Sequence, residues 1–143
     1  MSRPSLRLLG VDYGEARTGI AICDPSGFLA SGLMTLSKIG SLEQLAEKIT
    51  AIAQENSAVG IVLGLPLNMD DTEGPKCEVV RELAAMIQTE ALPVTLWDER
   101  CTTIAAQEIF RETKKSKKKR KQNIDALAAQ ILLQDYLDNR SKT

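Results

Sequence analysis

The sequence has no histidine, only three cysteines and few aromatic residues, with Phe, Trp and Tyr together at 3%. Without histidine the chain cannot use Ser-His-Asp or Cys-His catalysis, and it cannot bind zinc through imidazole. Cys23, Cys77 and Cys101 lie far apart and form no C-x-x-C pair. We therefore expect reduced, mostly buried thiols and neither a disulfide framework nor a zinc knuckle. Any catalytic chemistry is left mainly to carboxylates.

Long hydrophobic runs are also absent. No apolar run approaches the ~20 residues that a bilayer-spanning helix requires, and the apolar stretch near the N-terminus is too short for a secretory signal. We therefore expect a cytoplasmic protein. The chain has 143 residues, of which 43% are hydrophobic. These values fit a single domain over residues 1–143 with a sizeable core.

The hydrophobic pattern predicts an α/β domain. Five short apolar runs are typical of strands, at 6–12, 18–23, 28–36, 59–64 and 92–97. Helical spacing follows Ser41, which with Gln44 forms a capping box, and again follows Pro75. Two further helices are expected at 102–110 and 123–139. This order predicts a mixed five-stranded sheet flanked by helices.

Acidic residues stand where several of these elements begin or end. Asp12 closes the first strand, Asp98 and Glu99 follow the last strand, and Asp125 lies in the first turn of the final helix. Ligands of α/β sheets gather outside the carboxyl ends of the strands. Converging carboxylates repel one another, and bound Mg²⁺ or Mn²⁺ relieves that repulsion. Two such ions about 4 Å apart can activate water and stabilise the leaving oxygen of a phosphodiester.

Each carboxylate also has a simpler interpretation. Asp125 could complement the helix dipole, Asp12 could be a turn former, and Asp98 or Glu99 could be an exposed strand end. Strand alternation sends Asp98 and Glu99 to opposite faces of the sheet, and the sequence alone does not choose between them.

A basic tract at residues 114–121 holds seven of the 18 Lys and Arg, so the rest of the chain has 11 cations and 19 carboxylates. Such a cluster on an acidic domain suggests a polyanionic partner that is met at one place. We expect a flexible loop that becomes ordered on binding, and the alternative is a solvated linker. The tract consists of Lys114, Lys115, Lys117, Lys118, Lys119, Arg120 and Lys121.

Four ordered motifs resemble those of a known family. The segments DYGEARTG, GLPLNMDDTEG, WDERCTT and IDALAAQILLQDYL are similar to successive motifs of the YqgF family, also called RuvX. These bacterial proteins are described as Holliday junction resolvases and as pre-16S rRNA nucleases. The resemblance runs from about Leu6 to Leu137 and implies an RNase H-like fold. It also implies that Asp12, Glu99 and Asp125 occupy the acidic positions of the family's site, which favours Glu99 over Asp98.

The charge pattern and the resemblance together suggest a hypothesis. The chain would be a metal-dependent endonuclease of structured nucleic acid that processes the 5′ end of pre-16S rRNA in ribosome biogenesis. Asp12, Glu99 and Asp125 would hold two Mg²⁺ or Mn²⁺ ions. Phosphate contacts would come from the basic tract and from Arg17, Arg100 and Thr102. With few aromatic residues, recognition would depend on the backbone and shape of the nucleic acid.

Three alternatives remain open. The first is a Holliday junction resolvase of DNA recombination and repair, for which a homodimer would be suited because two symmetric cuts need two sites. The second is a catalytically silent nucleic-acid-binding factor. The third is an actin-like or sugar-kinase-like ATPase, because Gly14 and Gly19 could form a phosphate-binding hairpin. Those ATPases close two such domains over the nucleotide, and this chain has the length of one. The sequence does not decide between monomer and homodimer.

Overall fold

The computed structural model describes residues 6–37, 40–68, 70, 72–88, 92–98 and 124–140. The helix expected at 102–110 and the basic tract at 114–121 lie outside the described residues. The elements, in chain order, are β1 (Leu8–Asp12), β2 (Arg17–Cys23), β3 (Ala30–Ser37), α1 (Leu42–Glu55), β4 (Gly60–Leu65), α2 (Pro75–Gln88), β5 (Val94–Asp98) and α4 (Ile124–Arg140).

The five strands form one mixed sheet in the order β3-β2-β1-β4-β5. The pairs β1–β2 and β2–β3 are antiparallel, whereas β1–β4 and β4–β5 are parallel. The predicted five-stranded α/β architecture is therefore confirmed. Because β1, β4 and β5 run in the same direction, their carboxyl ends meet at one edge of the sheet.

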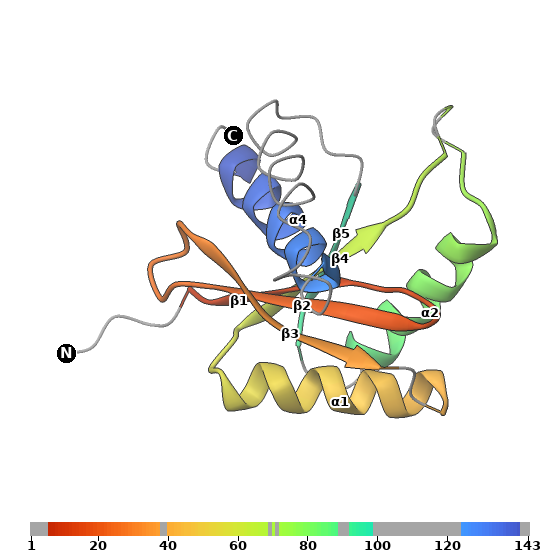
Figure 1. The fold of residues 1–143 in the computed structure, drawn as a ribbon, viewed down its shortest axis with the longest axis horizontal. Coiled ribbons are helices and arrows are strands. Elements are labelled where there is room, and N and C mark those ends of the chain that lie inside the picture. Colours follow the sequence, from red (N-terminus) through yellow and green to blue (C-terminus); the bar gives the residue numbers. More distant parts are fainter. Residues whose placement is uncertain are drawn as a thin grey trace.

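Helices cover both faces of the sheet (Figure 1). The larger core cluster joins Leu9, Val11 and other sheet residues to α1 and α2, which contact each other. The smaller cluster packs α4 residues, including Ala129 and Leu133, against Ala21 and the opposite face of the sheet. Alternate residues of each central strand thus belong to two different cores, which explains their near-continuous hydrophobicity.

The start of α1 agrees with the capping prediction. Ser41 adopts an extended conformation, and its Oγ accepts the amide N–H of Gln44 over 3.2 Å. The helix buries one stripe that includes Leu45, Ile49 and Ile52. Its other face is polar, as expected of a helix that lies on a sheet.

Gly10 lets α4 approach β1 closely. A Cβ atom at residue 10 would lie 2.8 Å from Leu133 Cβ and 3.1 Å from the carbonyl oxygen of Ala129. Any larger residue would force the helix or the strand to move. The absence of a side chain at Gly10 therefore sets the distance between β1 and α4.

The turn before β3 differs from the prediction. Phe28 and Leu29 were expected within a strand over 28–36, but β3 begins at Ala30. The carboxylate of Asp24 accepts the amide N–H groups of Phe28 and Leu29, each over 2.7 Å, and also interacts with Ser26. This local bonding competes with strand pairing and explains the later start. The Leu29 amide, followed by Ser26 and the Phe28 amide, lowers the pKa of Asp24.

Two of the three cysteines lie within the described residues. Cys23 and Cys77 are buried free thiols, as predicted, and Cys101 lies outside the described part. No helix in the described ranges is long and apolar enough to cross a membrane.

Candidate functional site

Asp12 is the last residue of β1 and lies, half-buried, at the edge of the sheet where the parallel strands end. It pairs with Gly19 of β2. Successive residues of a strand point to opposite faces, and Gly10 faces α4. Asp12, two residues later, is therefore on the α4 face. The bonds that fix β1 and β2 thus present this carboxylate beside the final helix.

The packing of β5 shows on which face of the sheet Asp98 lies. Trp97 packs in the α4 core, whereas Leu96 and Val94 pack in the core of α1 and α2. Alternation then places Asp98 with Leu96, on the face opposite to Asp12. This placement is evidence against Asp98 as a partner of Asp12, and it comes from the structure. Glu99, the residue that the family resemblance favours, lies outside the described residues.

The first turn of α4 lies near the carboxyl end of β1. The helix runs antiparallel to β3, because Ala126 lies over Gly32, Gln130 bonds Ala30, and Arg140 reaches the carbonyl of Gly27. β3 has the same direction as β1 in the sheet. The start of α4 therefore points toward the edge at which Asp12 stands.

Position 125 belongs to this first turn. It precedes Ala129, whose carbonyl lies over Gly10, by one helical turn. The backbone at 125 thus belongs to the turn that lies next to the end of β1. The side chain of Asp125 is outside the described part of the structure.

Gly64 lies between the two strands that carry acidic ends. It pairs with Trp97, and it follows Val62 of the α4 core, so it is on the same face as Asp12. Since β4 lies between β1 and β5, these two strands are about 10 Å apart. Gly64 is buried and adds no side chain of its own to the α4 face of β4. Gly64 was not predicted as a site residue, because its position between β1 and β5 is visible only in the fold.

The chemistry of this edge suits a hard cation. Carboxylate oxygens are the ligands that Mg²⁺ and Mn²⁺ prefer, and Asp12 is partly shielded from water. Among the side chains that the structure describes, no three Asp, Glu, Cys or His residues form a metal-binding group. Two of the three predicted ligands, Glu99 and the side chain of Asp125, are not among them.

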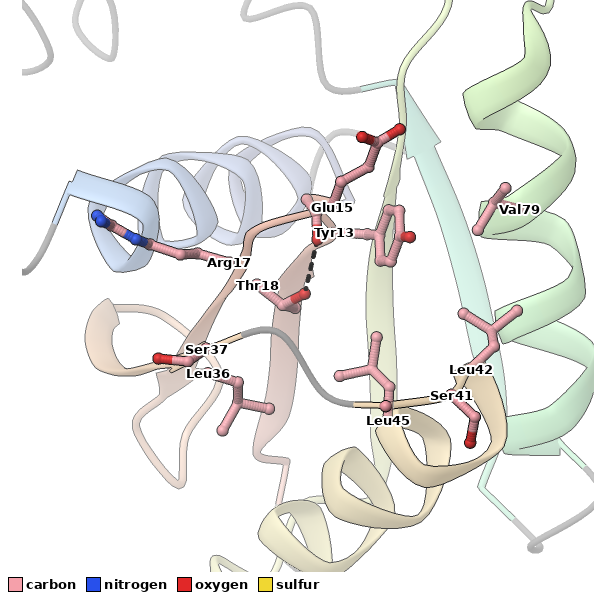
Figure 2. A pocket seen from close by; sticks show the side chains of 12 residues that line it. Tyr13, Glu15, Arg17, Thr18, Leu36, Ser37, Ser41, Leu42, Leu45 and Val79 are labelled. Atoms are coloured by element: carbon pink, nitrogen blue, oxygen red, sulfur yellow. Dashed lines mark hydrogen bonds between the residues drawn. The ribbon is translucent and has the colours of Figure 1, made fainter.

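Arg17 is the one predicted phosphate contact within the described residues. It is exposed at the start of β2, two residues before Gly19, the pairing partner of Asp12. Alternation places Arg17 on the α4 face with Asp12, and Figure 2 shows its side chain pointing away from Tyr13. Arg100, Thr102 and the seven cations of the basic tract lie outside the described part.

The β1–β2 hairpin, with Arg17 among its lining residues, also borders a pocket of about 320 Å³ (Figure 2). It is bounded by the hairpin, the end of β3, the N-terminus of α1 and Val79 of α2. The hairpin is tight, because a Cβ atom at Gly14 would lie 2.3 Å from the carbonyl oxygen of Arg17. Thr18 Oγ1 also donates to the carbonyl of Gly14 over 3.5 Å. This pocket was not predicted from the sequence, since its walls come from four separate elements of the fold.

Comparisons with known proteins agree with this architecture. A solved structure titled "T. thermophilus RuvC in complex with Holliday junction substrate" matches with a TM-score of 0.61 and 12% identity, over 95% of this chain and 96% of that one. A second structure, Thermus thermophilus RuvC, matches with a TM-score of 0.57 and 14% identity, over 96% and 97% of the two chains. At such identities the likeness shows the fold alone, and it confirms the RNase H-like arrangement of a mixed five-stranded sheet.

Sequence relatives are much closer. A Leuconostoc mesenteroides protein is 40% identical over 96% of this chain and 98% of its own length, and one from Clostridium botulinum (strain Alaska E43 / Type E3) is 41% identical over 96% and 100%. Both carry the name "Putative pre-16S rRNA nuclease". The model of the family described as "RuvX: Holliday junction resolvase" matches residues 6–139. The chain belongs to the RuvX family, also called YqgF.

Proposed function

We propose that this chain is a divalent-metal-dependent endonuclease of structured nucleic acid, and that it processes the 5′ end of pre-16S rRNA. The observation that carries the proposal is the convergence of Asp12, at the end of β1, with the first turn of α4, which contains residue 125. The relatives named as pre-16S rRNA nucleases support the choice of substrate. An endonuclease of this kind would act in ribosome biogenesis.

We assign Asp12, Glu99 and Asp125 as the ligands of two Mg²⁺ or Mn²⁺ ions. When bound, the ions would supply an activated water and would stabilise the leaving oxygen of the phosphodiester. Strands β1 and β5 are about 10 Å apart, so carboxylates that reached in from Asp12 and from Glu99 would leave room for two ions about 4 Å apart. The position of Asp98 on the opposite face supports Glu99 as the β5 ligand.

The chain itself would bind and orient the nucleic acid. Arg17, on the face of Asp12, would hold a phosphate near the cleaved bond, and Arg100 and Thr102 would add contacts from the segment after β5. The basic tract at 114–121 would increase affinity without sequence preference, because each neutralised phosphate releases counterions. The acidic remainder of the chain would disfavour binding elsewhere on the surface.

The test compares two labelled substrates, a precursor of the 16S rRNA 5′ end and a four-way DNA junction, with Mg²⁺ or Mn²⁺. We expect the wild type to cut the RNA, and Asp12→Asn and Glu99→Gln to lower the rate by roughly 100-fold or more. Asp98→Asn is the matched control. It removes a charge at the same strand end but on the other face, so cleavage should persist.

The family description favours one further candidate, a Holliday junction resolvase. Cutting of the DNA junction alone would establish that role and would disprove the rRNA role. Binding without cutting of either substrate would instead indicate a catalytically silent nucleic-acid-binding factor. Equal loss in Asp12→Asn and Asp98→Asn would contradict the assignment of the site.

A further inference from the structure

The pocket beside the β1–β2 hairpin has the size and lining of a site for one flat, partly polar molecule. Its volume of about 320 Å³ is at the lower end of the range for small-molecule pockets. Leu36, Leu42, Leu45 and Val79 provide apolar walls. The half-buried ring of Tyr13 projects among them (Figure 2).

Polar groups at the mouth of the pocket could form hydrogen bonds with the edge of such a molecule. Glu15 is exposed there and offers carboxylate oxygens that can accept from an amino group. The Ser41 Oγ accepts the Gln44 amide, which leaves its hydroxyl hydrogen for donation. An aromatic ring between apolar walls, with acceptors and a donor at the rim, matches a nucleobase.

The pocket also lies close to the proposed site of cleavage. Tyr13 follows Asp12 directly, so their Cα atoms are about 3.8 Å apart. Tyr13 packs with the core of α1 and α2, whereas Asp12 is on the α4 face. A nucleic acid with one phosphate at Asp12 could therefore reach the pocket only by passing around the edge of the sheet. A base that remains paired and stacked in a duplex cannot reach the pocket by that path.

We propose that this pocket binds one unpaired nucleobase of the substrate, adjacent to the phosphodiester held at Asp12. The proposal rests on the proposed nuclease function and narrows its substrate to nucleic acid with an unpaired nucleotide beside the cleaved bond. Tyr13 stacks on the base, and the rim groups bond its edge. The low aromatic content of the chain does not contradict this role, since a single ring in the pocket is sufficient.

The test measures base insertion separately from cleavage. The probes are single-stranded 12-nucleotide RNAs with one 2-aminopurine at successive positions, and the same RNAs annealed to a complement, with Ca²⁺ in place of Mg²⁺ so that the carboxylates keep a bound cation while cutting is suppressed. We expect wild-type protein to quench the fluorescence of single-stranded probes and to leave the duplex probes unchanged. Tyr13→Phe should behave like the wild type, whereas Tyr13→Leu should bind about tenfold more weakly and lose the quenching.

Two further variants keep the test decisive. Val79→Trp fills the pocket from α2 without removing Tyr13, and it should also abolish the quenching. Phe28→Leu removes an aromatic ring that is 70% exposed in the β2–β3 turn, at the other end of β2 from the pocket, and it should leave the binding and the quenching unchanged. Thermal unfolding identifies any variant that fails to fold, and if Tyr13→Leu does so, Val79→Trp decides.

Quenching that is absent in the wild type, or that persists in folded Tyr13→Leu and Val79→Trp, overturns the pocket proposal. Such a result leaves the nuclease proposal intact if Asp12-dependent cleavage is still observed. Conversely, Tyr13-dependent quenching by a protein that cuts neither RNA nor DNA supports the pocket and disproves the nuclease. The two proposals therefore fail in different experiments.

Discussion

The indole Nε1 of Trp97 donates a hydrogen bond to Oδ2 of Asp135 over 3.0 Å, which joins the last strand of the sheet to the final helix. The Trp97 ring also meets the Tyr136 ring edge to face, with centroids 5.2 Å apart and an angle of 87° between the planes. In the chain, Glu99 follows the last residue of β5, and residue 125 lies in the first turn of α4. This contact therefore holds together the strand that precedes one proposed ligand and the helix that contains another.

Replacing Trp97 by Phe should destabilise the protein by about 1–3 kcal/mol, because it removes a donor from a buried carboxylate. Asp135 is 4% exposed and would keep the amide of Asn139, at 3.2 Å from Oδ1, as its side-chain donor. Urea unfolding of Trp97→Phe, Asp135→Asn and the double variant measures the coupling between the two residues. Asp138→Asn, on the exposed side of the same helix, is the control and should change stability by about 0.5 kcal/mol or less. Additive effects of the two changes would contradict a direct interaction.

The sequence predicted the sheet well because apolar runs and turn residues are local features. It also predicted that Asp12 ends the first strand, since an acidic residue after a buried apolar run is visible without any neighbour. It could not choose between Asp98 and Glu99, because alternation gives only relative faces. The packing of Trp97 against α4 shows which face of the sheet Trp97 occupies, and alternation then places Asp98 on the other face. Phe28 and Leu29 were misassigned because the Asp24 carboxylate competes for their amides.

Two strand glycines also show what cannot be predicted from the sequence alone. Gly10 and Gly64 are ordinary strand residues when only the sequence is considered. The need for a glycine at residue 10 comes from α4, which packs against it, whereas Gly64 lies between two strands with acidic ends. The helix that packs on Gly10 is more than a hundred residues away in the chain. No local pattern could have predicted which glycines need to lack a side chain.

Gly10→Ala should therefore destabilise the fold by about 1–3 kcal/mol, since its Cβ would lie 2.8 Å from Leu133 Cβ. Displacement of α4 would also separate residue 125 from Asp12, so cleavage should fall in protein that is still folded. Gly32→Ala is a matched control under the same helix, because its Cβ would lie 3.4 Å from Ala126 Cβ, which is ordinary contact. We expect it to be neutral or slightly stabilising by urea unfolding. Equal losses in the two variants would show that close packing at Gly10 is not the cause.

Arg17→Gln should weaken binding of nucleic acid and reduce the slope of log affinity against log salt concentration by about 1. The reason is that Arg17 is exposed on the face of Asp12 and would neutralise one phosphate. Fluorescence anisotropy with a labelled RNA, over a series of KCl concentrations, measures the slope. Lys48→Gln, which removes an exposed cation from α1 below the sheet, serves as the control and should leave the slope unchanged. A slope that both changes alter equally would indicate a general charge effect.

Asp24→Asn should lower the melting temperature at neutral pH and have little effect in acid. Hydrogen bonds from the Leu29 amide, Ser26 and the Phe28 amide hold the pKa of Asp24 below its ordinary value of about 3.9. A carboxylate whose pKa is lower in the folded state stabilises that state above the unfolded pKa, and this stabilisation is lost as the pH falls toward the folded pKa. The melting temperatures of wild type and variant should thus differ by an about constant amount between pH 5 and 8. The difference should begin to shrink below about pH 4 and continue to shrink as the pH falls toward the folded pKa. Glu47→Gln, on the exposed side of α1, provides the control for general loss of charge. A difference between wild type and Asp24→Asn that persists undiminished at pH 2 would show that the shape of the side chain, and not its charge, holds the turn.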